Sequence, residues 1–226
     1  GIDVGGTKIE GVLLDHGGQH LQQVRIPTPT GDYMGTVNAI VALSRELENI
    51  SQESCTIGVA VPGSISPETG LHRNANSVCL NGQSFLSDLE ESLGRKISME
   101  NDANCFTLSE SIDGAGFGYD VVFGIILGTG VGAGISINGQ VRKGPNSITG
   151  EWGHNPLPWP TKSEIEKHQC FCGKKDCIET FLSGPSLFED YRKSGGELST
   201  IQKMAENISL DTIARQTIDR YAERLG

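Results

Sequence analysis

Short apolar runs separated by glycine pairs fill the first quarter of the chain. Ile2–Val4, Ile9–Leu14 and Leu21–Ile26 are strand-like, and Gly5-Gly6 and Gly17-Gly18 interrupt them. Glycine pairs between apolar runs are typical of tight turns. The pattern therefore predicts an antiparallel meander of three strands.

Helical spacing follows. From Asp32 to Glu48, large apolar residues recur at steps of three or four, which predicts a helix. Further helices are expected over Phe85–Leu93, with Gly94 as its C-cap, and over Asn101–Ile112. Buried strands are expected at Thr56–Val61 and Lys96–Glu100.

Three spaced glycines, Gly114, Gly116 and Gly118, then interrupt the pattern. We predict a linker here, between a first α/β domain of residues 1–115 and a second of residues 119–226. The second domain is expected to begin with two strands around a glycine-rich turn and to be mostly helical after Gly184. The first residue is not Met and the last helical pattern stops abruptly, so we expect the chain to be part of a longer protein.

Composition narrows the class of partner. The 226 residues are 36% hydrophobic and carry a net charge of −10, which favours a globular protein without a nucleic-acid or membrane surface. No apolar stretch has bilayer length, and no signal peptide is evident. Cys55, Cys79 and Cys105 are isolated and are interpreted as reduced core thiols, so we expect a cytoplasmic protein.

Two glycine turns could cradle phosphate groups. The first is Asp3-Val-Gly5-Gly6-Thr7-Lys8, in which backbone amides, a hydroxyl and an ammonium group could meet an anion, and Asp3 could hold Mg²⁺ through water. The second is Gly128-Thr129-Gly130-Val-Gly132-Ala-Gly134, which has neither a Walker A ending nor the dinucleotide fingerprint. Ordinary hairpin turns remain the alternative for both.

A carboxylate stands at the start of the third helix. Asp102 follows a strand and Asn101, so it could act as a general base for a hydroxyl nucleophile. Either residue could instead be only the helix N-cap.

Taken in order, five motifs resemble the ROK family of sugar kinases and sugar-responsive repressors. The resemblance covers residues 1 to about 191 and lies in Asp3–Lys8, Asn101–Asn104, Leu127–Gly130, Gly150–His154 and Cys170-x-Cys172-x4-Cys177-x-Glu179. It implies an actin/hexokinase-like (ribonuclease H-like) α/β fold of two domains with a central cleft. Family members normally continue further at the C-terminal end, where adenine contacts lie, so these contacts are not assigned.

The resemblance also implies residue roles. Asp102 would be the catalytic base. The phosphates of ATP, with Mg²⁺, would be met by Asp3, Gly5, Gly6, Thr7, Lys8, Gly128, Thr129, Gly130 and Gly132. The sugar would be met by Gly63, Asn76, Asn101, Asp102, Glu151, His154 and Glu179. A homodimer is expected.

The cysteine cluster predicts a structural Zn²⁺ site. Cys170, Cys172 and Cys177 are closely spaced, and His154 of the family motif completes three thiolates and one imidazole. A disulfide is the alternative, but it would leave one cysteine over and would be unusual in the cytosol.

We therefore predict an ATP-dependent hexose kinase that phosphorylates the 6-hydroxyl group. The segments Asn74–Ser77, Leu80–Gln83 and Glu151–Pro158 resemble the fructokinase branch, so fructose is the expected substrate. The alternatives are an N-acetylhexosamine, mannose or glucose kinase of the same family, a sugar-responsive regulator, and a sugar-binding module without catalysis.

Overall fold

The computed structural model describes residues 1–226, and its first sheet has the strand order β3-β2-β1-β4-β7. These strands are Ile2–Val4 (β1), Lys8–Leu14 (β2), His20–Pro27 (β3), Gly58–Val61 (β4) and Ser98–Asn101 (β7). β1, β2 and β3 pair antiparallel, as predicted, whereas β4 and β7 extend the sheet in parallel to β1. The parallel side brings the carboxyl ends of β1, β4 and β7 to one edge.

Helices α1 (Tyr33–Ser51) and α2 (Phe85–Leu93) pack with this sheet around the larger apolar core. The predicted apolar stripe of α1 is buried, and the Asp32 side chain caps the helix by accepting from the Gly35 amide at 2.9 Å. The leucines of α1 press on Gly11, where an added Cβ would lie 2.7 Å from Leu47. Close packing on β2 therefore requires glycine at this position.

A second, three-stranded sheet has the order β10-β9-β8, with β8 at Val121–Leu127, β9 at Val131–Ile137 and β10 at Gln140–Val141. Helix α3 (Asp102–Ile112) packs across β8 and β9. An added Cβ at Gly124 or Gly134 would approach the Thr107 hydroxyl to 2.3 or 2.5 Å. These two glycines let the backbone of the hairpin lie directly on the helix that begins at Asp102.

Short elements escape the sequence pattern. They are β5 (Ser64–Ile65), β6 (His72–Arg73), β10, α4 (Glu179–Leu182), and the 3-10 turns Val78–Leu80 and Trp152–His154. Two to four residues are too few to establish a period of 2 or 3.6, so they could not be predicted from periodicity.

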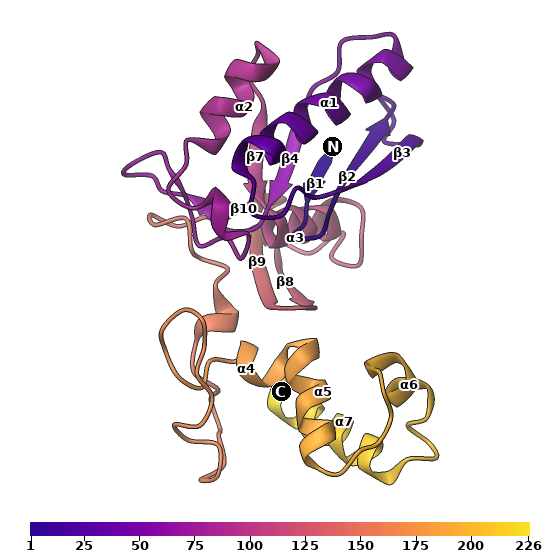
Figure 1. Cartoon of the computed structure of the whole chain (residues 1–226), viewed down its shortest axis with the longest axis vertical. Coiled ribbons are helices and arrows are strands. Elements are labelled where there is room, and N and C mark those ends of the chain that lie inside the picture. The colour runs from indigo at the N-terminus through magenta and orange to yellow at the C-terminus, as the bar shows by residue number, and fades with distance from the viewer.

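The C-terminal part is helical, as expected. It contains α5 (Gly184–Lys193), α6 (Ile201–Glu206) and α7 (Thr212–Leu225). Figure 1 shows the first sheet with α1 and α2 at one end of the long axis, α4 to α7 at the other, and the β8–β9 hairpin between them. None of the helices has both the length and the apolar character that a bilayer crossing needs.

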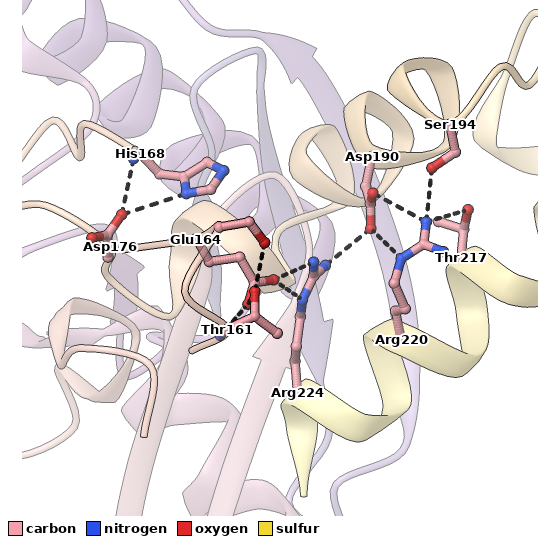
Figure 2. A network of polar contacts seen from close by, with 10 residues as sticks. Thr161, Glu164, His168, Asp176, Asp190, Ser194, Thr217, Arg220 and Arg224 are labelled. Atoms are coloured by element: carbon pink, nitrogen blue, oxygen red, sulfur yellow. Dashed lines mark hydrogen bonds and ion pairs between the residues drawn. The ribbon is translucent and has the colours of Figure 1, made fainter. Parts of the chain in front are cut away.

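An ion-pair network joins α5, α7 and the loop that precedes α4 (Figure 2). Arg224 pairs with Glu164 at 2.6 Å and with Asp190 at 3.0 Å, and Arg220 pairs with Asp190 at 3.1 Å. The network ties the start of the cysteine-bearing loop to the C-terminal helix.

The buried His72 makes the stability of the fold depend on pH. It is 1% exposed, its Nε2 lies 2.8 Å from the Pro62 carbonyl oxygen, and its Nδ1 has no partner. Burial lowers the pKa of His72, opposed by the Pro62 carbonyl. Because the folded pKa lies below the ordinary value of 6.5, the stability contribution is complete above that pH and is lost as pH falls through 6.5 to the folded value.

We therefore expect His72→Gln, which keeps a donor for Pro62, to lose less stability than the wild type between pH 7 and pH 5. Each kcal/mol of this linkage corresponds to about 2–4 °C in Tm for a chain of this size. Thermal unfolding at several pH values measures it. His16→Gln, at a fully exposed side chain, is the control and should follow the wild type; identical pH profiles for all three proteins would contradict the prediction.

Candidate active site

A pocket of about 450 Å³ lies where the end of β7, the β8–β9 turn and the Gly150–Glu151 segment meet. Ten of the residues predicted from the sequence line it: Gly63, Asn76, Asn101, Asp102, Gly128, Thr129, Gly130, Gly132, Glu151 and Glu179. The fold thus brings the predicted sugar residues, except His154, and the second glycine turn to one cavity.

Asp102 has a free carboxylate oxygen in this pocket. Asn101 is the N-cap of α3, since its Oδ1 accepts from the Asn104 amide at 3.1 Å. Asp102 is the first helical residue, and its Oδ1 accepts only from the Ala103 amide at 2.9 Å. The capping role belongs to Asn101, which leaves Asp102 Oδ2 without a partner in the chain.

Asn101 also fixes the Pro62–Gly63 loop. Its Nδ2 donates to the Gly63 carbonyl oxygen at 3.0 Å. Gly63 has φ +84°, and an added Cβ would lie 2.4 Å from the Arg73 carbonyl oxygen, so only glycine fits. The His72 ring also hydrogen-bonds the neighbouring Pro62 carbonyl. The loop therefore forms a fixed wall of the pocket.

The second glycine turn is closed by contacts with two helices. The Gly128 amide donates to the Gly130 carbonyl at 2.9 Å, and the Gly184 amide of α5 donates to the Gly128 carbonyl at 2.8 Å. Glu179 of α4 accepts from the Val131 amide at 2.9 Å, and an added Cβ on Gly130 would lie 2.7 Å from the same carboxylate oxygen. Close approach of Glu179, rather than a left-handed backbone, explains glycine at position 130.

The first glycine turn borders a neighbouring pocket. The Gly5 amide donates to the Lys8 carbonyl at 2.9 Å, and Thr28 Oγ1 donates to the Gly5 carbonyl at 2.7 Å. Gly6 and Thr7 line a separate space of about 460 Å³, which shares Asn76 with the main pocket. The two turns are thus on adjacent spaces, and a phosphate clamp between them stays a prediction.

Negative charge concentrates around the main pocket. Burial raises the pKa of Glu151, and Asp102 and Glu179 add to the rise while His154 opposes it. Burial also raises the pKa of Asp3, with further rises from Asp102 and Glu10 and an opposing effect of Lys8. Such a set of carboxylates favours a ligand that brings hydroxyl donors or a cation.

Four predicted metal ligands meet beside this pocket. The ligand atoms of His154, Cys170, Cys172 and Cys177 all lie within 4.8 Å of one another. Cys172 and Cys177 Sγ are 3.7 Å apart, and Cys170 Sγ is 3.5 Å from His154 Nδ1. Around tetrahedral Zn²⁺, bond lengths of about 2.3 Å to sulfur and 2.0–2.1 Å to nitrogen give edges of about 3.8 and 3.6 Å. The cluster therefore fits this ion.

A hairpin presents the three cysteines. Gln169 and Lys175 form an isolated antiparallel bridge, and the Cys170 amide donates to the Lys174 carbonyl at 2.9 Å. Asp176 accepts from the His168 amide at 2.9 Å and lies 3.4 Å from its ring (Figure 2). Burial raises the pKa of the Cys177 thiol to about 12, with a further rise from Cys172. A bound cation would favour the thiolate form of this set.

His154 connects the cluster to the pocket. Its Nδ1 faces Cys170, and its Nε2 lies 4.0 Å from the Glu151 carboxylate. The segment rests on β9 through two glycines: an added Cβ at Gly150 would lie 1.9 Å from the Ala133 carbonyl oxygen, and one at Gly153 would lie 2.3 Å from that of Val131. His154 itself does not line the main pocket.

Several residues near the site were missed by sequence reasoning. Phe171 and Asn74 line the pocket, Thr28 holds the first turn, and Glu100 contacts the start of α3. Phe171 was identifiable from its place between two cysteines, and Asn74 from its place in the Asn74–Ser77 segment, which was compared with the fructokinase branch but not assigned to the site. Thr28 and Glu100 carry no local signal.

Comparisons with known proteins match the whole chain to one family. Residues 1–226 match the model described as the ROK family. An N-acetyl-D-glucosamine kinase of Yersinia enterocolitica is 39% identical over 231 residues, which cover 100% of this chain and 76% of the relative.

Two solved structures resemble the whole arrangement. A ROK hexokinase from Thermus thermophilus has a TM-score of 0.80 at 26% identity, over 99% of this chain and 73% of that one. A ROK family glucokinase from Streptomyces griseus, solved with glucose and AMPPNP, has a TM-score of 0.78 at 25% identity, over 99% and 75%. The predicted actin/hexokinase-like fold is confirmed.

Proposed function

The chain belongs to the ROK family, and from this premise we propose that it is an ATP-dependent sugar kinase whose acceptor is N-acetyl-D-glucosamine. The observation that carries the proposal is the unpartnered Oδ2 of Asp102 in a pocket lined by acidic side chains and a glycine turn. AMPPNP, present in one related structure, is an ATP analogue and supports ATP as the phosphoryl donor.

The relatives do not support fructose as the preferred substrate. Those from Yersinia enterocolitica and Haemophilus influenzae carry the name N-acetyl-D-glucosamine kinase, so the alternative of an N-acetylhexosamine kinase fits better. The segments that suggested fructose, Asn74–Ser77 and Glu151–Pro158, include residues of the pocket wall and of the metal cluster.

Asp102 is the proposed general base. Its Oδ2 takes the proton of the sugar 6-hydroxyl group while the hydroxyl oxygen bonds to the γ-phosphorus of ATP. The bond between the γ-phosphorus and the β,γ-bridging oxygen breaks, which releases ADP. The amides of Gly128 to Gly130 and the Thr7 and Lys8 side chains would meet the phosphates. Mg²⁺ would neutralise charge on the phosphates, and Asp3, whose carboxylate accepts no hydrogen bond within the chain, fits its preference for oxygen ligands.

The sugar would lie against Asn76, Asn101, Glu151 and Glu179. When ionised, Glu151 and Glu179 are hydrogen-bond acceptors only, which suits sugar hydroxyl groups as donors. Zn²⁺ at the cysteine cluster would be structural, since four protein ligands close its shell. At 3.7 Å, the Cys172 and Cys177 sulfurs are far beyond the roughly 2.05 Å of a disulfide bond.

A panel of sugars tests the substrate. We expect N-acetylglucosamine to give the highest kcat/KM in a coupled assay of ADP release, ahead of N-acetylmannosamine, glucose, mannose and fructose. A polar site that pairs with a substrate group can reject an analogue lacking it by about 10⁴–10⁵-fold.

Two results would contradict the proposal. A kcat/KM for fructose above that for N-acetylglucosamine would support the substrate predicted from the sequence. Sugar binding without ADP release for any sugar would favour the sugar-responsive regulator or the non-catalytic module. The homodimer stays a prediction, which light scattering would test.

A further inference from the structure

The Glu100 side chain supports the segment that carries Asp102. Glu100 belongs to β7 and precedes Asn101 directly. Its Oε1 accepts from the Asn101 amide at 2.9 Å and from Asn104 Nδ2 at 3.0 Å. One carboxylate oxygen therefore contacts the residues on both sides of Asp102.

Asn104 depends on this contact. It is only 9% exposed, and its Oδ1 has no partner. Its side-chain amide group is therefore held by Glu100 alone, on the first turn of α3. Loss of the carboxylate would leave a second buried polar atom of Asn104 unpaired, which the helix start could relieve only by moving.

The other Glu100 oxygen reaches the loop that follows β10. Lys143 Nζ lies 2.5 Å from Glu100 Oε2, and the Arg73 side chain of β6 donates to the Asn146 carbonyl in the same loop. This loop leads directly into Gly150 and Glu151. Two contacts, one from the first sheet and one from the separate β5–β6 pair, thus fix the approach to the proposed sugar carboxylate.

We propose that Glu100 and Lys143 are positioning residues for phosphoryl transfer, joining the segment of the base Asp102 to the segment of Glu151. The inference rests on the proposed kinase function. Neither residue lines the main pocket, so each acts through its neighbours. A misplacement of about 1 Å in a reacting group can cost about 10²-fold in rate, which gives the pair its effect.

Stability should respond less than turnover. The Lys143 side chain is 53% exposed and that of Glu100 is 25% exposed, and exposed ion pairs stabilise a fold by only about 0–1 kcal/mol. Lys143→Met should therefore leave Tm nearly unchanged while it lowers kcat, and this separation distinguishes a positioning role from a merely structural one.

The test is a cycle of four variants in the intact chain, with kcat, sugar KM, Tm and metal content measured for each. Glu100→Gln and Lys143→Met each remove the ion pair but keep the Oε1 contacts, so each should lower kcat by about 3–10-fold, and the double variant by no more than either. Glu100→Ala also frees Asn104 and should lower kcat by about 10–100-fold with KM changed less than about threefold.

The Glu90–Lys96 pair supplies the control. It has a similar separation of 2.6 Å and lies before β7, away from the pocket, so Lys96→Met should match the wild type. Wild-type turnover in Glu100→Gln and Lys143→Met, or losses that simply add in the double variant, would overturn the inference even if Glu100→Ala fails to fold. A wild type that releases no ADP with any sugar would instead contradict the proposed function itself.

Discussion

Asp102→Asn should fold normally, bind the sugar and lose about 10²–10⁴-fold in kcat, the range that general-base catalysis supplies. The amide oxygen can still accept from the Ala103 amide, as Asp102 Oδ1 does at 2.9 Å. The helix cap is unaffected, because Asn101 provides it. Only Oδ2, the proposed proton acceptor, is replaced, by a group that cannot take a proton.

The measurements are ADP release, sugar affinity by calorimetry, and Tm. Asp113→Asn at the other end of the same helix, where Asp113 is the exposed C-cap residue, is the matched control and should keep wild-type turnover. A kcat near the wild-type value in Asp102→Asn would show that the carboxylate is not the base, and the proposed mechanism would then be wrong.

Periodicity predicted the fold wherever an element was long enough to show it. The meander, α1, α2 and α3 are confirmed, with ends shifted by a few residues at most, and Gly94 caps α2 with φ +69°. The parallel addition of β4 and β7 was not predicted, because an apolar pattern identifies a strand but not its neighbours in the sheet. The strand β9 begins at Val131, inside the Gly128–Gly134 segment that was predicted to be a turn, since its glycines lie within the ladder against α3.

The site required more than spacing. Taken alone, Asn101-Asp102 allowed either residue to be the cap, and the structure assigns that position to Asn101. Each glycine turn alone allowed an ordinary hairpin. The order of five motifs identified the family, and that resemblance supplied the residue roles.

Contacts between distant segments were beyond local patterns. Glu100 and Lys143 are 43 positions apart in the printed sequence, and nothing near either residue indicates the other. The substrate is a similar case: the acidic residues of the pocket suit any polyol, whereas selection of a 2-acetamido group depends on a few side-chain positions. For both, three-dimensional geometry or comparison with relatives is needed.

Removal of the metal should have the second large effect. We expect one Zn²⁺ per chain by elemental analysis, and Cys172→Ser should lose it, because Cys172 is one corner of a set whose ligand atoms lie within 4.8 Å of one another. Structural zinc binding is worth about 10–16 kcal/mol in small peptides, so the hairpin should lose its order.

Loss of the metal should weaken sugar binding, because two of the ligands hold residues of the proposed sugar site. His154 would no longer be held beside Glu151, 4.0 Å away, and Cys177 would no longer fix the chain just before Glu179, whose carboxylate accepts from the Val131 amide. We therefore expect sugar KM to rise by about 10–100-fold, the range in which loss of a partner that orients a metal ligand lowers metal affinity or activity, while the KM for ATP changes less. Cys55→Ser, at a thiol that lies beside the end of α1 and is not part of the metal cluster, should keep both metal and KM. Fully active protein without bound metal, or a disulfide within Cys170–Cys177 under reducing conditions, would contradict the zinc assignment. Because Asp102 contacts none of the four ligands, Cys172→Ser and Asp102→Asn should affect different constants, KM in the first and kcat in the second.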